Sequence, residues 1–327
     1  MISLRLALTL ALAVTGAFAL DRLCAIRGLL PPGFRMPWRR ALAFLAVTAL
    51  LAVGVFSPVT SLGRPLETDV SQISTPQLFL LHALMVATLG VWFLLGFAGW
   101  AGRPEPPPAP PVEPVIEPVV EPVPGAEGDL AGFPTLVEPP PPPLPPRISL
   151  GRRFAEQFGF IPRTSVSREV GLGVLLGIGA WVVVLLALMA VAGVLWAAGG
   201  EKAMPKAPPA LVPFIAGLPI WVRFLVSLSA GVVEETFFRG FLQPRIGIAL
   251  STLFFTVAHL SYGSPFMLIG IALLSLIYAF LVKWRQNLWP AIAAHALFDG
   301  VQLLVVVPAA LKMLQGAGGK LAGFLLW

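Results

Sequence analysis

One stretch of this chain, residues 170–200, contains no charged residue at all. About 20 consecutive apolar residues suffice for a helix to cross a bilayer, so this stretch predicts a transmembrane helix. Hydrophobic residues make up 57% of the sequence and charged residues only 12%, which is typical of polytopic membrane proteins rather than soluble domains. The sequence therefore predicts an all-α fold in which transmembrane helices form a bundle.

Apolar segments recur along the chain and predict about eight spans. The predicted spans are residues 3–20, 41–57, 78–100, 170–200, 218–243, 246–260, 266–282 and 288–307. Small residues at Ala17 and Ala19 would also suit a cleaved signal peptide, but we favour an uncleaved first span. Because proline disfavours helix continuation, we expect spans to end at Pro58, Pro244 and Pro308.

Basic residues lie beside particular spans and predict which loops stay in the cytoplasm. The predicted loop 21–40 carries five arginines, and residues 150–168 carry four among aromatic residues, which indicates a basic amphipathic segment on the membrane face. Arg245 and Arg285 lie two spans apart, so both can face the cytoplasm. We expect an integral protein of a bacterial inner membrane. The net charge of +6 follows from these loops and predicts no nucleic-acid partner.

Residues 101–149 hold 18 of the 34 prolines, and proline removes backbone donors and forbids helix. They predict an extended cytoplasmic linker between an N-terminal three-span unit, residues 1–100, and a C-terminal unit, residues 150–327. A proline-recognising partner could dock on residues 101–149, but a simple spacer is the favoured interpretation.

Residues 231–240 place two glutamates and an arginine inside an apolar helical pattern. Ionisable groups at membrane depth are costly, so they usually face a protein interior and have a function there. Glu235 and Arg239 are four residues apart and are predicted to form an ion pair. Glu234 points about 100° away around the helix and is left available as a general base.

Two later segments each add a histidine. Phe255 and His259 share one helix face, so the phenyl ring should pack beside the imidazole. His295 and Asp299 share another face, and an aspartate can hold a histidine in one tautomer.

These side chains suit two kinds of hydrolytic site. In the first, Glu234 activates a water that His259 helps to bind, while His295 and Asp299 stabilise an oxyanion. In the second, Glu234, His259 and His295 bind a metal ion such as zinc, which lowers the pKa of its bound water. The residues favour neither the metal-free nor the metalloprotease option.

Other histidine and cysteine chemistry fits less well. His82, near the outer end of the third span, is predicted to be structural because intramembrane functional groups usually have partners. The single cysteine, Cys24, excludes an internal disulfide and lies in the predicted Arg-rich loop with no histidine nearby in sequence. The chain lacks the His-Glu-x-x-His motif and a Gly-rich phosphate loop.

The three motifs resemble those of the CAAX prenyl protease and bacteriocin-processing (CPBP, or Abi) family of intramembrane endopeptidases. That family carries Glu-Glu-x-x-x-Arg, Phe-x-x-x-His and His-x-x-x-Asn or Asp on successive helices, and the match covers about residues 168–307. The resemblance implies an eight-helix-type protease core. It also implies that the first glutamate and first histidine activate water, and that the second histidine and its polar neighbour stabilise the oxyanion.

The sequence thus predicts an intramembrane endopeptidase that acts on a peptide or protein substrate, lipidated or not, among membrane lipids. A non-proteolytic membrane scaffold or a bacteriocin self-immunity factor could use the same buried polar residues for helix packing. A proton-coupled transporter could also use them, although no inverted repeat is evident.

Overall fold

The computed structural model describes residues 3–60, 74–99, 148–203, 211–262 and 264–316, and all regular secondary structure in these ranges is helical. The predicted linker, residues 101–149, lies outside these ranges apart from its last two residues. Within these ranges, seven helices are long and apolar enough to cross a membrane. They are Leu4–Ile26, Pro37–Thr60, Leu80–Phe97, Val166–Gly199, Ile220–Ala258, Pro265–Arg285 and Trp289–Lys312. The predicted polytopic helical bundle is confirmed.

The N-terminal unit is built from three long helices and short helical pieces. In chain order these are α1 (Leu4–Ile26), η1 (Pro32–Arg35), α2 (Pro37–Leu51), η2 (Ala52–Phe56), α3 (Ser57–Thr60), α4 (Thr75–Leu78) and α5 (Leu80–Phe97). Helix α1 runs past the predicted end of the first span at residue 20. Cys24 is therefore buried within this helix and does not lie in a loop as predicted.

The C-terminal unit contains the other long helices. In order these are α6 (Leu150–Phe158), α7 (Val166–Gly199), η4 (Gly200–Ala203), α8 (Leu211–Gly217), α9 (Ile220–Ser229), η5 (Ala230–Glu234), η6 (Thr236–Leu242), α10 (Gln243–Ala258), η7 (Leu260–Tyr262), α11 (Pro265–Arg285), α12 (Trp289–Val301), η8 (Gln302–Val306) and α13 (Val307–Gly316). The amphipathic segment predicted at 150–168 is not one helix: it is helical in α6, and its last residues, including Arg168, already belong to α7.

The chain reverses direction inside the helical segment Ile220–Ala258. Gly247 has φ +84°, a backbone conformation that favours glycine. The Ser251 hydroxyl donates to the Phe238 carbonyl at 2.7 Å, although 13 residues along a straight helix would separate them by about 20 Å. The predicted fifth and sixth spans are therefore two separate limbs, and the second limb delivers His259 back towards the middle of the first.

Pro58, Pro244 and Pro308 do not end their helices as predicted. Each proline follows a π-helical turn by two residues: Pro58 follows η2, Pro244 follows η6 and Pro308 follows η8. The helix continues beyond each proline. A proline offers no N–H to the carbonyl four residues earlier. Each proline is the second residue of the α-helical segment that follows the π turn, namely α3, α10 or α13. In the first turn of a helix a missing N–H is tolerated, so the helix continues.

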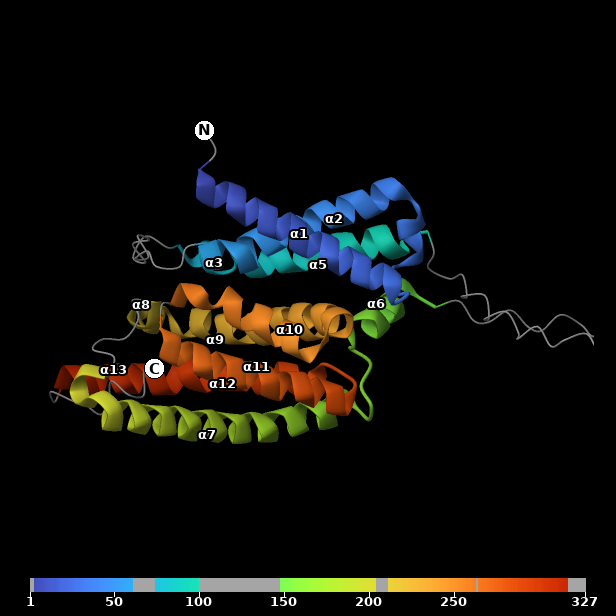
Figure 1. Ribbon diagram of the computed structural model, residues 1–327. Coiled ribbons are helices and arrows are strands. Elements are labelled where there is room, and N and C mark those ends of the chain that lie inside the picture. The colour runs from blue at the N-terminus through green and yellow to red at the C-terminus, as the bar shows by residue number, and fades with distance from the viewer. Residues whose placement is uncertain (1–2, 61–73, 100–147, 204–210, 263, 317–327) are drawn as a thin grey trace, which may run out of the picture.

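The helices form layers in which the N-terminal unit covers one side of the C-terminal unit. Helices α1, α2 and α5 lie on one side, α9 and α10 in the middle, and α11, α12 and α7 beyond them (Figure 1). One hydrophobic core joins the two units. Within it, the Trp92 ring contacts Phe158 and Phe241, with centroids 6.3 and 5.1 Å apart. The two units that the linker separates in sequence are thus packed together.

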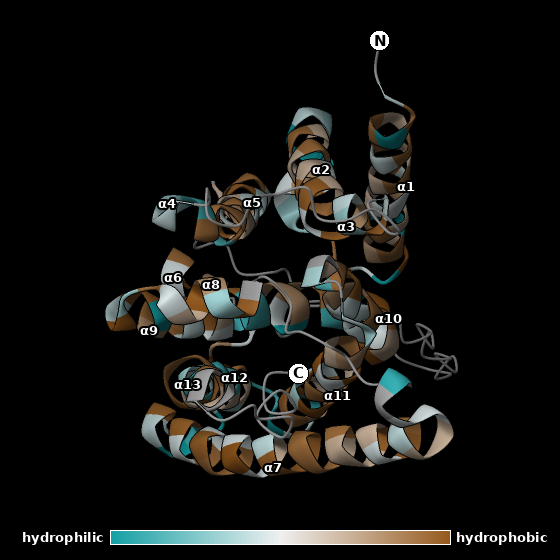
Figure 2. Ribbon diagram, turned by 90° about the vertical axis from the view of Figure 1, so that its left-hand side faces the viewer, coloured by the Kyte–Doolittle hydropathy of each residue, from teal (hydrophilic) through white to brown (hydrophobic). Residues whose placement is uncertain are grey.

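Helix α7 packs closely along α12 through two glycines. A Cβ added at Gly173 would lie 2.4 Å from the Pro290 carbonyl oxygen, and one at Gly177 would lie 2.9 Å from Ala294 Cα. Small residues four apart allow such close approach between membrane helices. The opposite face of α7 exposes apolar side chains, and hydrophobic colouring dominates this helix (Figure 2). This arrangement fixes α12, which carries His295 and Asp299.

Basic residues gather at one end of the bundle. Arg27 donates to the Arg245 carbonyl at 2.7 Å, which ties α1 to the start of α10. Arg285 makes two hydrogen bonds, of 3.0 and 2.7 Å, to the buried carboxylate of Glu169, which ties α11 to α7. The loops predicted to share one side of the membrane therefore lie at the same end of the molecule.

Candidate active site

Two adjacent glutamates lie where the first limb of the reversed segment is π-helical. Glu234 ends η5, and Glu235 separates it from η6. Such π-helical turns occur frequently at functional sites because the extra residue per turn changes which side chains face a given neighbour. Here the two carboxylates enter different surroundings.

Glu235 belongs to a closed ionic cluster. Its Oε2 lies 3.3 Å from Arg239 Nε, and both side chains are completely buried, so the predicted ion pair is present. Its Oε1 accepts a hydrogen bond from His295 Nδ1 at 2.8 Å. Arg239 also donates to the Ser275 hydroxyl at 3.2 Å. The cluster thereby links the first limb to α11 and α12.

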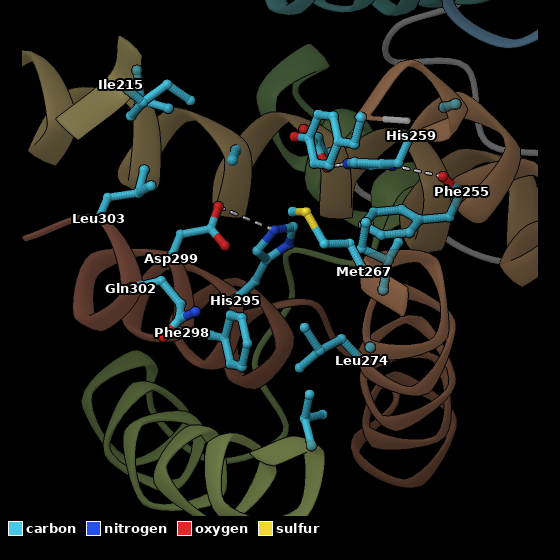
Figure 3. A pocket seen from close by; sticks show the side chains of 18 of the residues that line it. Ile215, Phe255, His259, Met267, Leu274, His295, Phe298, Asp299, Gln302 and Leu303 are labelled. Atoms are coloured by element: carbon cyan, nitrogen blue, oxygen red, sulfur yellow. Dashed lines mark hydrogen bonds and ion pairs between the residues drawn. The ribbon is translucent and has the colours of Figure 1, made fainter. Parts of the chain in front are cut away.

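His295 is held on both edges and on one face of its ring. Its Nε2 lies 3.6 Å from Asp299 Oδ2, as predicted from their spacing. The Tyr278 ring stacks on the imidazole with centroids 5.1 Å apart. Figure 3 shows His295 and Asp299 pointing towards each other at the wall of a pocket. An imidazolium at this position would be compensated by the carboxylates of Asp299 and Glu235.

His259, at the end of the second limb, is fixed in one orientation. Its Nδ1 donates to the Phe255 carbonyl at 2.7 Å, and the two rings are 4.6 Å apart, so the predicted packing of Phe255 against His259 is present (Figure 3). With its proton committed on Nδ1, the neutral imidazole offers the Nε2 lone pair. That atom lies 3.9 Å from Glu234 Oε2. Oε2 is buried and has no hydrogen-bond partner among the described residues.

His82 also contacts Glu234, which the sequence did not predict. Its Nε2 lies 3.2 Å from Glu234 Oε1, and its Nδ1 lies 3.0 Å from the Ser229 hydroxyl. The histidine predicted to be structural thus touches the carboxylate predicted to be the base. The available signal was its position inside an apolar span, where an ionisable side chain usually has a partner.

The predicted catalytic residues line a single cavity of about 410 Å³. Glu234, His259, His295 and Asp299 all reach it, and apolar side chains from α5, α7 and α11 make up much of the remaining wall. Tyr262, also at this wall, has its pKa raised by burial and by the nearby charges of Glu234 and Asp299. Its phenol therefore stays protonated at neutral pH and can donate a hydrogen bond.

The predicted metal ligands do not fit a zinc ion in this arrangement. Zinc sites in enzymes usually have three protein ligands around the ion. Among the residues that the structure describes, no three His, Cys, Asp or Glu side chains are grouped to hold a metal. His295 points its two nitrogens at Glu235 and Asp299, and therefore not at Glu234 with His259.

Comparison with known proteins supports the resemblance seen in the motifs. Residues 216–301 match the family model described as "Type II CAAX prenyl endopeptidase Rce1-like". This segment is similar to that family. It contains all seven motif residues, from Glu234 to Asp299, whereas His82 lies outside it. The apolar helices indicate an integral membrane protein, and the match shows that residues 216–301 are similar to an endopeptidase family.

A curated relative matches over a similarly short range. "Uncharacterized protein YpbD" of Bacillus subtilis (strain 168) is 35% identical over 81 residues, which is 24% of this chain and 42% of that protein. The chain thus matches less than half of the length of this relative. No solved structure gives a significant match to the chain.

Proposed function

We propose that this protein is an intramembrane endopeptidase in which Glu234 activates a water molecule. The observation that carries the proposal is the buried, unpartnered Oε2 of Glu234, which faces His259 Nε2 across 3.9 Å inside the cavity. This gap exceeds a direct hydrogen bond and suits one water that bonds to both atoms. Glu235 Oε2 also lacks a hydrogen-bond partner among the described residues, but it forms an ion pair with Arg239, and Glu235 does not line the cavity.

In the proposed reaction, Glu234 takes a proton from the water while the water oxygen bonds to the substrate carbonyl carbon. The carbonyl π electrons move to the oxygen and form an oxyanion. When the C–N bond breaks, Glu234 returns the proton to the leaving amine, which yields a carboxylic acid and an amine. A carboxylate in a water-poor cavity suits this exchange of one proton in each direction.

His295 is the proposed oxyanion partner through Nε2, because the 3.6 Å between this atom and Asp299 Oδ2 exceeds a hydrogen bond and leaves the N–H to donate into the cavity. An ionised Asp299 alone would repel an oxyanion, but its carboxylate lies 3.6 Å from His295 Nε2 and can support positive charge there. Tyr262 offers a further neutral donor at the same cavity. These positions support transition-state stabilisation by a preorganised site.

The substrate is proposed to be a membrane-associated peptide or protein, lipidated or not. The apolar wall of the cavity, which includes Leu81, Met85, Leu188 and Ile271, suits an apolar side chain or lipid group beside the scissile bond. We further propose a bacterial inner membrane, with the basic end of the bundle and the Pro-rich linker in the cytoplasm.

Comparative peptidomics of cells that carry wild-type protein or Glu234→Gln tests the proposal. Peptide termini present with wild type should be lost with the variant, because glutamine keeps the shape of glutamate but cannot accept the proton. Glu156→Gln is the matched control, since Glu156 is an exposed carboxylate on α6. Identical peptides from all three strains would contradict hydrolysis and favour a scaffold or immunity role.

Metal analysis of the purified protein tests the other form of the mechanism. We propose a glutamate-activated water without zinc, so the active preparation should contain far less than one zinc per chain. Stoichiometric zinc, lost together with activity on chelation, would contradict the metal-free form while leaving proteolysis intact.

A further inference from the structure

We propose that His82 is a positioning residue for Glu234, so that the N-terminal unit completes the active site of the C-terminal unit. This inference rests on the proposed hydrolysis by Glu234. It starts from the contact of 3.2 Å between His82 Nε2 and Glu234 Oε1. These residues lie 152 positions apart, on opposite sides of the Pro-rich linker.

The hydrogen bonds around His82 fix which nitrogen faces Glu234. Ser229 donates its hydroxyl proton to the Val226 carbonyl at 3.0 Å. Its oxygen therefore accepts from His82 Nδ1–H at 3.0 Å. His82 Nε2 is then left to share one proton with Glu234 Oε1, either as an imidazolium beside a carboxylate or as a neutral ring beside a carboxyl group.

This contact orients the carboxylate of Glu234 for its proposed task. Because His82 holds Oε1, Oε2 is turned towards His259. The two imidazoles flank the Glu234 carboxylate. They fix its rotation and determine which of its oxygens contacts the water. His82 itself is largely buried at the cavity wall, with an exposed side-chain fraction of 14%.

The packing of the two units explains how His82 reaches this place. Helix α5, which carries His82, contacts η5, which carries Glu234. The aromatic residues Phe93 and Trp92 on the same helix belong to the core shared with Phe158 and Phe241. The N-terminal unit is therefore more than a membrane anchor, because its docking delivers a polar group to the site.

Nitrogen NMR of histidine tests the contact without an activity assay. The chain has three histidines, so selective ¹⁵N-histidine labelling of the full-length protein in lipid nanodiscs gives three imidazole pairs of signals. His82→Gln assigns the signals of His82. We expect Glu234→Gln to move the Nε2 signal of His82, whereas Asp299→Asn, the matched control, should move that of His295 and leave His82 unchanged. A His82 signal that is the same in wild type and Glu234→Gln would overturn the proposal.

Kinetics then separates a positioning role from packing. With a peptide found by peptidomics as the probe, we expect His82→Ala to lower kcat by about 10-fold to 100-fold with little change in KM. His82→Gln should recover part of this loss, because its amide N–H can still donate to Glu234. If His82→Ala keeps the wild-type kcat while Glu234→Gln is inactive, the role of His82 is overturned but hydrolysis by Glu234 stands. Wild-type kcat in Glu234→Gln would overturn both hydrolysis by Glu234 and the role of His82.

Discussion

Glu234 and Glu235 are neighbours in the chain but occupy opposite kinds of environment. Glu235 is completely buried in a cluster with Arg239 and His295, where opposite charges compensate one another. The Oε2 atoms of both glutamates lack a hydrogen-bond partner among the described residues, but only Glu234 borders the cavity, between His82 and His259. A fully compensated charge can hold helices together, whereas an available oxygen can do chemistry.

This contrast shows two ways in which a membrane protein can offset the desolvation of a buried carboxylate. Around Glu235, one turn of helix supplies an arginine and a second helix supplies an imidazole, which offsets desolvation. Around Glu234, the two imidazoles come from helices far apart in sequence, and the gap between Glu234 and His259 leaves room for a water molecule. We therefore expect substitutions in the closed cluster to affect stability most, and those in the open one to affect turnover.

The largest effect should come from His259, which borders the open carboxylate. His259→Gln should lower kcat by about 10²-fold to 10⁴-fold, because the proposed water loses one of its two partners. The free energy of unfolding, measured by denaturant titration in detergent micelles, should change little. His295→Gln is the comparison in the closed cluster and should lower both stability and turnover. If the two variants lost the same amount of unfolding free energy and of kcat, the division between a stabilising cluster and a catalytic carboxylate would be contradicted.

A large loss of stability should follow when the buried ion pair is broken. Glu235→Leu leaves Arg239 buried without its carboxylate and should cost about 3–5 kcal/mol of unfolding free energy. Denaturant titration in micelles measures this loss directly.

The double variant Glu235→Leu with Arg239→Leu is the control for that loss. It removes both charges, so it should be more stable than Glu235→Leu alone. Additive losses from the two single substitutions would show that the pair is not coupled, and the closed cluster would lose its proposed role.

A moderate effect is expected where α7 packs against α12. Gly177→Ala should cost about 1–3 kcal/mol, because its Cβ would press on the backbone of α12 one residue before His295. Gly179→Ala is the matched control on the same helix, since its Cβ would meet no atom within 4 Å. If both variants unfold at the same denaturant concentration, close packing does not support the cluster.

The smallest effect should come from the bond that closes the reversal of the chain. Ser251→Ala removes the hydroxyl that donates to the Phe238 carbonyl and should cost about 0.5–1.5 kcal/mol. Turnover should fall as well, because this bond holds the limb that carries His259. A lower free energy of unfolding with unchanged kcat would show that the limb keeps His259 in place without this hydrogen bond.

Local spacing in the sequence was enough to predict the pairs within single helices. Glu235 with Arg239, Phe255 with His259, and His295 with Asp299 are each four residues apart, and each pair is in contact. Helix geometry alone determines such contacts.

Contacts between helices could not be predicted in this way. The bonds of His82 to Glu234 and of His295 to Glu235 depend on how separate helices pack, which spacing within one helix does not encode. The helix ends expected at Pro58, Pro244 and Pro308 were wrong because each proline lies in the first turn of a helical segment that follows a π turn, where a missing N–H is tolerated.

The cleavage rate per folded molecule of purified Glu234→Gln tests the account most directly. Wild type and variant would be reconstituted in the same lipid, with the folded fraction measured by denaturant titration and the rate measured on a peptide found by peptidomics. We predict a folded variant whose rate falls by at least about 10²-fold. A folded variant that cleaves at the wild-type rate would show that the open carboxylate is not the base.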